Sequence, residues 1–161
     1  MPDPFVQQTI RDLQLRPHPE GGFFREVYRS AEGVGSGKGP RSAATAIYFV
    51  LPEGTVSRFH RVLSDELWIY LDGAPLSLHL LDAALESATE AVVGCMDTAS
   101  ASPLHAVPAG SWQAALSRGV YTLVTCIVAP GFEFEDFTML EDEAETAARV
   151  RERYPALARF I

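Results

Sequence analysis

The sequence predicts an all-β barrel or sandwich with one helix near each end of the chain. From Thr45 onward, short runs rich in β-branched and aromatic residues follow one another, and turns built on Gly and Pro separate them. Many short strands separated by such turns are typical of a β-sandwich or barrel. The predicted strands span residues 45–51, 57–62, 67–71, 76–81, 90–95, 104–107, 112–116, 121–129 and 132–139.

Two helices are predicted from apolar residues that recur at intervals of three and four. The first helix follows from Phe5, Val6, Thr9, Ile10 and Leu13, and the second from Ala147, Val150, Tyr154, Leu157 and Ile161. Asp3 is expected to cap the first helix and Pro4 to be its first residue. The second helix is expected to break near Pro155 and to pack on the barrel.

The length of 161 residues predicts one domain that spans residues 1–161. The chain carries 13 basic and 21 acidic residues, which give a net charge of −8. Such a charge repels nucleic acid and anionic lipid, and no apolar run is long enough to span a membrane. Because the start lacks a secretory signal, we expect a cytoplasmic protein in which Cys95 and Cys126 are buried free thiols.

A His and a Glu stand between two glycines in the most informative segment of the chain. Gly54, His60, Glu66 and Gly73 have the spacing of the first motif of cupin barrels, which build a metal site there. Val62 stands where that motif has its second His. The second cupin motif, Pro-x-Gly-x-x-His, resembles residues 108–113, with Gln113 in place of the His. The resemblance therefore keeps two of the family's four metal ligands.

Six ordered motifs make the chain resemble, more narrowly, a small-cupin subfamily classed as a domain of unknown function. They read PHPEGGFFRE, IYF, FHRV, SDELW, VPAGSWQ and APGFEFEDF, and the resemblance covers about residues 10–140. It implies a cupin double-stranded β-helix, or jelly-roll barrel, with flanking N- and C-terminal helices. It also implies a homodimer similar in shape to sugar-nucleotide epimerases, and antiparallel sheet edges favour such pairing. It implies no particular reaction.

Strand alternation predicts a small-molecule pocket inside this barrel. Residues two apart on a strand point to the same face, so His60 and Val62 are expected to point inward together. On the next strand, Glu66, Trp68 and Tyr70 share one face. Polar groups inside an otherwise apolar barrel favour the binding of a small ligand of mixed polarity. A buried structural pair of His60 and Glu66 is the alternative.

Three residues are candidates for catalysis. His60 can carry a proton near neutral pH, and Glu66 can orient the imidazole ring and raise its basicity. Tyr48 is a candidate general acid, and a role as a core aromatic is its alternative. His18 is interpreted as a turn residue.

Further residues are expected to bind the ligand. Gln113 offers both a donor and an acceptor, and Arg25 can bind an anion bidentately, with a surface ion pair as the alternative. Arg25 and Glu26 point to opposite faces, and the sequence leaves open which one lines the pocket. Aromatic walls are expected from Trp68, Tyr70, Trp112 and Phe132.

No cofactor is expected, because a catalytic first-row metal usually needs three protein ligands. If a divalent metal binds, the candidate ligands are His60, Glu66 and Gln113. The leading hypothesis is a metal-independent cupin that binds a small polar or sugar-like metabolite, with isomerase or epimerase activity as an extension. Two alternatives stay open, a non-catalytic ligand-binding cupin and a metal-dependent dioxygenase or isomerase, so the sequence does not decide whether the protein is an enzyme.

Overall fold

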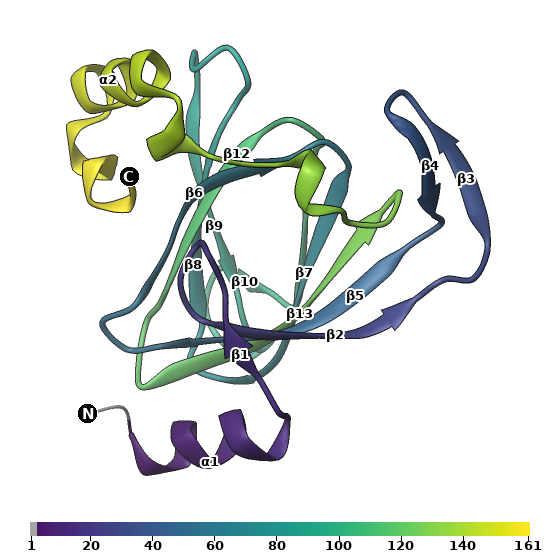
Figure 1. The fold of residues 1–161 in the computed structure, drawn as a ribbon. Coiled ribbons are helices and arrows are strands. Elements are labelled where there is room, and N and C mark those ends of the chain that lie inside the picture. Colours follow the sequence, from purple (N-terminus) through teal and green to yellow (C-terminus); the bar gives the residue numbers. More distant parts are fainter. Residues whose placement is uncertain (1–2) are drawn as a thin grey trace.

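The computed structural model describes residues 3–161 and confirms the predicted all-β fold with a helix near each end (Figure 1). The helices are α1 (Pro4–Asp12) and α2 (Ala144–Arg153), and the 3-10 turns are η1 (Phe134–Asp136), η2 (Leu140–Asp142) and η3 (Pro155–Phe160). The strands are β1 (Arg16–Pro17), β2 (Phe23–Arg29), β3 (Gly33–Ser36), β4 (Gly39–Ser42), β5 (Thr45–Pro52), β6 (Val56–Val62), β7 (Asp65–Gly73), β8 (Leu76–Leu81), β9 (Ala88–Val93), β10 (Ala101–Ser102), β11 (Leu104–Val107), β12 (Trp112–Ser117), β13 (Tyr121–Ala129) and β14 (Phe137–Met139).

Two six-stranded sheets form the barrel. The first sheet has the order β1-β2-β5-β13-β7-β11, and the second has the order β10-β9-β8-β12-β6-β14. Strand pairs are antiparallel except β9 with β10. The hairpin of β3 and β4 extends to one side of the barrel (Figure 1). This antiparallel pairing matches the jelly roll that the sequence predicts.

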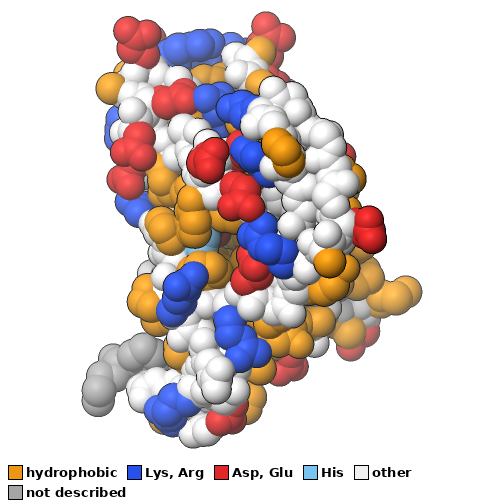
Figure 2. Space-filling model, turned by 45° about the vertical axis from the view of Figure 1, so that its right-hand side comes forward, with side chains coloured by type: hydrophobic (Ala, Val, Ile, Leu, Met, Phe, Trp, Pro, Cys, Tyr) orange, Lys and Arg blue, Asp and Glu red, His pale blue; other side chains and the backbone are white. Residues whose placement is uncertain are grey.

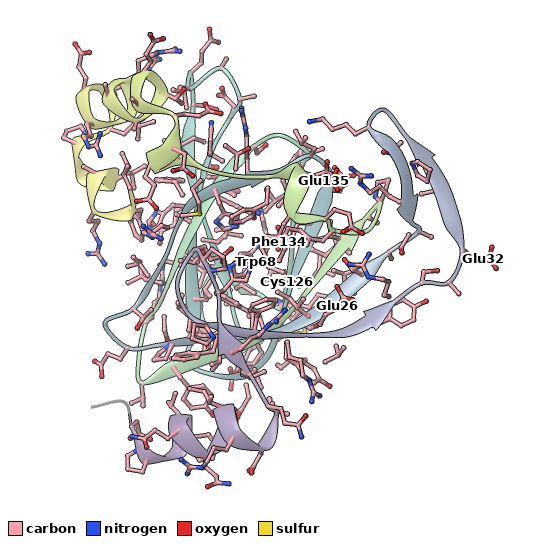
Figure 3. The ribbon with its side chains drawn as sticks, viewed as in Figure 1. Glu26, Glu32, Trp68, Cys126, Phe134 and Glu135 are labelled. Atoms are coloured by element: carbon pink, nitrogen blue, oxygen red, sulfur yellow. The ribbon has the colours of Figure 1, made fainter. Side chains whose placement is uncertain are left out.

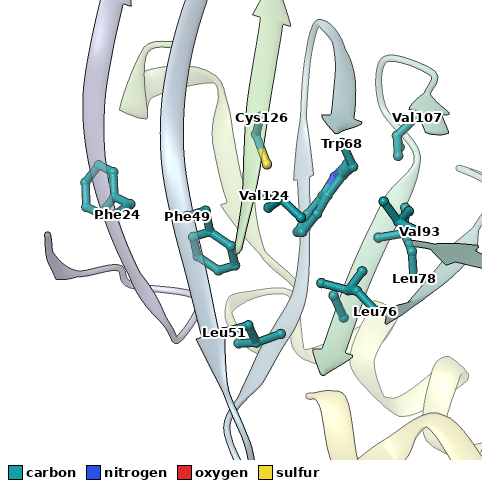
Figure 4. Close-up of a cluster of buried hydrophobic side chains, with 11 residues drawn as sticks. Phe24, Phe49, Leu51, Trp68, Leu76, Leu78, Val93, Val107, Val124 and Cys126 are labelled. Atoms are coloured by element: carbon teal, nitrogen blue, oxygen red, sulfur yellow. The ribbon is translucent and has the colours of Figure 1, made fainter. Parts of the chain in front are cut away.

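Apolar side chains from both sheets meet inside the barrel (Figure 4). Phe49 and Trp68 come from the first sheet, and Leu76 and Leu78 come from the second. The rings of Phe49 and Trp68 meet edge to face with centroids 5.8 Å apart, a favoured aromatic geometry. Phe49 also lines the cavity described below, so this core ends where the cavity begins.

The C-terminal segments cover the outer face of the second sheet, as predicted. Phe59 on β6 packs against Phe160 with ring centroids 6.0 Å apart, and Val150 of α2 lies in the same buried cluster. Helix α2 ends at Arg153 and η3 begins at Pro155, because proline has no N–H group to continue an α-helix. The predicted break near Pro155 is therefore confirmed.

The predicted start of the first helix is also confirmed, whereas two local predictions are wrong. Asp3 caps α1 by accepting a hydrogen bond from the Phe5 N–H at 2.8 Å. Residues 134–136 form η1 rather than strand, so only β14 remains of the predicted strand 132–139. Cys95 is exposed because β9 ends before it, whereas Cys126 is buried as expected. Among residues 3–161, no helix combines the length and apolar character needed to cross a membrane.

Candidate functional site

The barrel contains a cavity of about 210 Å³. Its lining comes from both sheets, from the turn between β1 and β2, and from the segment 132–137. Figure 2 shows a histidine side chain at the bottom of a hollow between hydrophobic side chains, with charged side chains nearby. Figure 3 shows Trp68 and Cys126 in the central region of the barrel, whereas Glu32 lies far from them on the β3–β4 side.

Alternation along the strands decides which side chains reach the cavity. On β5 the lining residues are Ile47 and Phe49, and on β6 they are His60 and Val62. Phe59 faces the opposite way, into the cluster under the C-terminal segments. His60 and Val62 therefore point inward together.

A bulge in β2 brings a second charged residue to the cavity. Glu26 lines it, and the register of β2 against β5 then shifts between Glu26 and Tyr28. The extra residue changes the alternation by one position, so Arg29 faces the cavity as well. Arg25 lies outside the lining and donates to the Gln14 side chain at 3.0 Å. Of the pair that the sequence left open, Glu26 is the one that lines the cavity.

Glu20 lies buried between two histidines. Its Oε2 is 3.2 Å from Nδ1 of His18 and 3.2 Å from Nε2 of His60. Its Oε1 accepts a hydrogen bond of 2.7 Å from the Ser57 hydroxyl. Because only 7% of the Glu20 side chain is exposed, the carboxyl group depends on these neighbours instead of water.

Two glycines allow the turn after Glu20 to pack against the barrel. Gly21 and Gly22 have φ angles of 113° and 70°, which L side chains rarely adopt. A Cβ at Gly21 would lie only 2.2 Å from the Val56 carbonyl oxygen, so the turn touches the β6 backbone. The Glu20 carbonyl also accepts a 2.8 Å hydrogen bond from the Arg58 N–H. These contacts place Glu20 beside the inward-facing side chains of β6.

Backbone contacts set the protonation of both histidine rings. Nδ1 of His60 lies 2.8 Å from the Arg58 carbonyl oxygen, which only accepts, so Nδ1 donates and Nε2 presents its lone pair to Glu20. Nδ1 of His18 accepts from the backbone N–H of Glu20 at 3.3 Å. Oε2 of Glu20 therefore lies between two acceptor nitrogens. With both histidines neutral and Glu20 ionised, no hydrogen atom lies between these three side chains. One additional proton is needed before they can form hydrogen bonds with one another.

Burial favours the uncharged forms of this cluster near neutral pH. Desolvation raises the pKa of Glu20 to about 8. Desolvation lowers the pKa of His18 to about 3, and the charges of His60 and Arg16 act in the same direction. Desolvation also lowers the pKa of His60, against the opposing charge of Glu66. At pH 7 the shared proton is therefore expected on Glu20.

Glu66 lines the cavity but bonds to other partners than His60. Its carboxylate accepts hydrogen bonds from the Gln113 amide at 2.5 Å and from the Cys126 thiol, and burial raises its pKa. Oε1 of Gln113 in turn accepts a 2.8 Å hydrogen bond from the Trp68 indole N–H. Trp68 and Gln113 thus support Glu66 from behind the lining. The predicted hydrogen-bonded pair of His60 and Glu66 is not formed.

The side chains at the cupin-motif positions do not fit the family's metal centre. Val62 has no donor atom, and the only oxygen of the Gln113 side chain is engaged by Trp68. Across residues 3–161, no three or more His, Cys, Asp or Glu side chains are grouped so that they could hold a metal ion.

Three other predicted site residues lie outside the lining. Tyr48 points away because the residues on either side of it on β5 face the cavity. Trp112 faces the outer cluster, where the Arg61 guanidinium lies 4.6 Å from its ring centroid. The Tyr70 hydroxyl donates to the carbonyl of Gly73 at 2.7 Å, so it is engaged at the end of its own strand, β7.

Phenylalanines form the apolar wall of the cavity. Phe132, predicted as a wall residue, lines it together with Phe134 and Phe137, and their ring centroids lie 5.0–6.0 Å apart. The Phe24 ring meets His18 edge to face at 4.5 Å. The cavity therefore has a polar end around Glu20 and an aromatic side, which suits a ligand of mixed polarity.

Residues 7–140 match the model of the family described as Cupin superfamily (DUF985). The chain belongs to this cupin family. That membership agrees with the barrel of two antiparallel sheets and with the motif residues His60 and Glu66, which both line the cavity.

Three relatives are about one-third identical to this cupin in sequence, and the solved structures of two of them share its fold. The uncharacterized protein YML079W of Saccharomyces cerevisiae is 31% identical over 167 residues, which cover 90% of this chain and 81% of that protein. A hypothetical protein from Leishmania major is 34% identical, with a TM-score of 0.83 over 97% of this chain and 96% of the other. Protein SO0799 from Shewanella oneidensis is 31% identical, with a TM-score of 0.85 over 96% of this chain and 95% of the other.

More distant solved structures share the fold alone. Oxalate decarboxylase from Bacillus subtilis has 13% identity and a TM-score of 0.59, over 86% of this cupin and 34% of that chain. The jelly-roll barrel is therefore shared by proteins of very different sequence, and the fold alone does not indicate the chemistry of this cupin.

The residues that the sequence-based prediction missed come from the N-terminal part of this cupin. His18 is more than a turn residue, because it lines the cavity with Glu20, and Arg16 and Arg29 line it too. The PHPEGG motif is the signal that could have pointed to His18 and Glu20, since its adjacent glycines indicate a tightly packed turn. The bulge that turns Arg29 inward has no comparable sequence signal.

Proposed function

We propose that this cupin binds a compact polar or sugar-like metabolite in its cavity and that Glu20 and His60 transfer protons in its isomerisation or epimerisation. The supporting observation is the buried Glu20 carboxyl group, whose Oε2 lies 3.2 Å from an imidazole nitrogen on each side. Ionisable groups with perturbed pKa values in a cavity are typical of acid–base catalysts.

Glu20 can act as the general acid and His60 as the general base of this reaction. Protonated Glu20 can donate to a carbonyl oxygen of the ligand, and neutral His60 can accept a proton at Nε2 from the adjacent carbon. For an isomer, His60 delivers its proton to the former carbonyl carbon while Glu20 takes the proton of the neighbouring hydroxyl group, so both side chains regain their initial protonation. For an epimer, water protonates the first carbon from the other face, Glu20 takes back the enol proton, and His60 releases its proton to the hydroxide that remains. Neither reaction needs an oxidant or a reductant.

The volume of the cavity limits the ligand to a small molecule. About 210 Å³ corresponds to roughly seven water molecules at ~30 Å³ each. The volume also lies below the range of about 300–1,000 Å³ for sites that hold drug-sized ligands. A monosaccharide or a short organic acid suits this space better than a sugar nucleotide.

Hydrogen–deuterium exchange at carbon tests the proposed proton transfer. Small aldoses, ketoses and oxo acids would be incubated with the protein in D₂O and followed by NMR. We expect at least one compound to gain deuterium beside its carbonyl group. Glu20→Gln keeps the shape and a hydrogen-bonding group, and it should slow the exchange by about 10²–10⁴-fold, the usual contribution of general acid–base catalysis.

Glu53→Gln is the matched control, because Glu53 is exposed in the turn between β5 and β6, outside the cavity lining. It should exchange at the wild-type rate, and treatment with a chelator should leave the rate unchanged. Saturable binding without exchange of any compound would reject the catalytic part and favour a non-catalytic binding module. Exchange that is lost with the chelator and restored by a divalent metal would favour the metal-dependent alternative.

A further inference from the structure

We infer that the metabolite carries a carboxylate group and that Arg16 binds this group at the cavity. The inference rests on the proposed function, because it names the class of ligand that the same cavity takes. It is carried by the missing ionic partner of Arg16, by its position over Phe24 and by the ion pairs that already engage Arg29 in the same lining.

Arg16 lines the cavity without an ionic partner. Within residues 3–161, its guanidinium forms no hydrogen bond and no ion pair. Arg29, which also lines the cavity, bonds Glu26 at 2.9 and 2.8 Å, Glu133 at 2.7 Å and the Phe132 carbonyl at 3.0 Å. The charge of Arg29 is therefore matched by its neighbours, and Arg16 keeps its N–H donors for a ligand.

Phe24 holds the Arg16 guanidinium beside the cavity. The two residues face each other in the register of β1 and β2, and the guanidinium carbon lies 4.9 Å from the Phe24 ring centroid. A cation–π contact of this kind orients the guanidinium without consuming its N–H donors. The charge of Arg16 also helps to lower the pKa of His18, so it acts on the polar end of the cavity.

The ion pairs within the lining leave the guanidinium of Arg16 as the cation available to an anionic ligand. Glu20 holds its proton at pH 7 because burial raises its pKa to about 8, so it does not repel an anion. Glu26 and Glu133 are paired with Arg29. The guanidinium of Arg16 is thus the cation that an anionic ligand can neutralise.

A carboxylate suits this position better than a phosphate. The two parallel N–H groups of a guanidinium match the two oxygens of a carboxylate, and one charge balances one charge. A phosphate monoester carries between about 1.5 and 2 negative charges at pH 7. Its second charge would have no cationic partner in the lining, because Arg29 is already paired with Glu26 and Glu133. The aromatic side of the cavity then accommodates a short apolar or planar body.

Calorimetric titration with matched acids and amides tests the inference. The probes are benzoate, mandelate and pyruvate, each beside its primary amide, with phenyl phosphate as the phosphate probe. We expect at least one acid to bind at least tenfold more tightly than its amide, which equals about 1.4 kcal/mol. Arg16→Gln should remove this preference, and Arg16→Lys should keep part of it, because the charge remains while the planar fork is lost.

Arg25→Gln is the matched control, since it removes a neighbouring arginine that lies outside the lining. It should bind like the wild type. Arg16→Gln and Arg25→Gln should both melt like the wild type, because the Arg16 side chain is exposed and that of Arg25 is only half-buried. Equal binding of acids and amides, tighter binding of phenyl phosphate than of every acid, or no binding of any acid would overturn the inference. An acid preference that survives Arg16→Gln would overturn it as well.

These outcomes are distinguishable from a failure of the proposed function. Glu20-dependent exchange on a neutral sugar, together with no preference for acids, would reject the carboxylate and keep the proton transfer. Arg16-dependent binding of an acid without Glu20-dependent exchange would keep the carboxylate and reject the catalysis.

Discussion

At the scale of single residues, burial and the two flanking imidazole nitrogens favour the protonated form of Glu20, against the Ser57 hydrogen bond and the charge of Arg58. Burial removes the carboxyl group from water, and the two nearest imidazole nitrogens are acceptors in the neutral state. An ionised carboxylate would face two lone pairs, whereas a carboxylic acid can donate to one of them. Glu20 and His60 are therefore coupled, and the protonation of one depends on that of the other.

This coupling predicts a dependence of stability on pH. The folded protein binds the Glu20 proton more tightly than the unfolded chain, because burial raises its pKa from 4.5 to about 8. The resulting stabilisation is complete below pH 4.5 and is lost as the pH rises through about 8. The lowered pKa of His18 acts in the opposite sense, with a contribution that is complete above pH 6.5 and lost as the pH falls through about 3.

The clearest window for Glu20 is therefore between pH 6.5 and 8, where the His18 contribution is constant. Over this window we expect the free energy of unfolding of the wild type to fall relative to Glu20→Gln by up to about 2 kcal/mol, since one proton corresponds to about 1.4 kcal/mol for each pH unit. Urea unfolding of both proteins at the two pH values measures the difference. Parallel pH profiles for the two proteins would show that Glu20 ionises normally in the fold.

At the scale of elements, an ion pair attaches the aromatic wall of the cavity to the β3–β4 hairpin. Nε of Arg41 donates to Oδ2 of Asp136 at 2.9 Å, and Nη2 donates to Oδ1 at 3.1 Å. Asp136 lies in η1, between the wall residues Phe134 and Phe137. A two-point contact of this kind fixes orientation as well as distance. The hairpin thus helps to hold the wall in place, although it lies beside the barrel.

Arg41→Gln should loosen this wall. We expect faster amide hydrogen exchange in residues 132–137 and weaker binding of any ligand that uses the cavity, because local opening exposes the segment more often. Lys38→Gln is the matched control, since it removes one positive charge from the turn of the same hairpin, and its exchange should equal that of the wild type. Unchanged exchange in Arg41→Gln would show that the phenylalanine packing alone holds the segment.

At the scale of the whole molecule, the first sheet has an exposed edge. Strand β1 pairs with β2 only at Phe23 and Phe24, so the rest of β2 has a free edge on that side. Val27 is 39% exposed and Tyr28 is 56% exposed on this part of β2. An unpaired edge strand with exposed apolar side chains is a site where two copies of a chain can pair.

The homodimer expected from the sequence stays a prediction that this edge supports. Light scattering in dilute solution should give twice the 17.6 kDa of one chain. Replacement of both Val27 and Tyr28 by Lys should shift the mass to that of one chain if β2 forms the interface, because charged side chains oppose edge pairing. A wild-type mass of one chain would contradict the dimer, and a dimeric double variant would place its interface elsewhere.

Local patterns in the sequence were enough for most of the fold. The strands, both helices, the Asp3 cap and the break at Pro155 depend on short-range periodicity, proline chemistry and glycine turns, which act over a few residues. The same alternation correctly turned His60 and Val62 to one face. It could also have excluded Trp112 as a neighbour of inward-facing Gln113, because adjacent strand residues point to opposite faces.

By itself, the sequence determined the cupin barrel, through its resemblance to the motifs of that family, and the inward direction of His60, through the alternation of side chains along a strand. The tertiary structure decided which carboxyl group His60 meets. Glu66 is near it in sequence but bonds Gln113, whereas Glu20 comes from a turn that two glycines allow to pack on β6. It also turned Arg29 inward through a bulge. Such partners depend on strand register and on contacts between distant segments, and neither is encoded in the spacing of neighbouring residues.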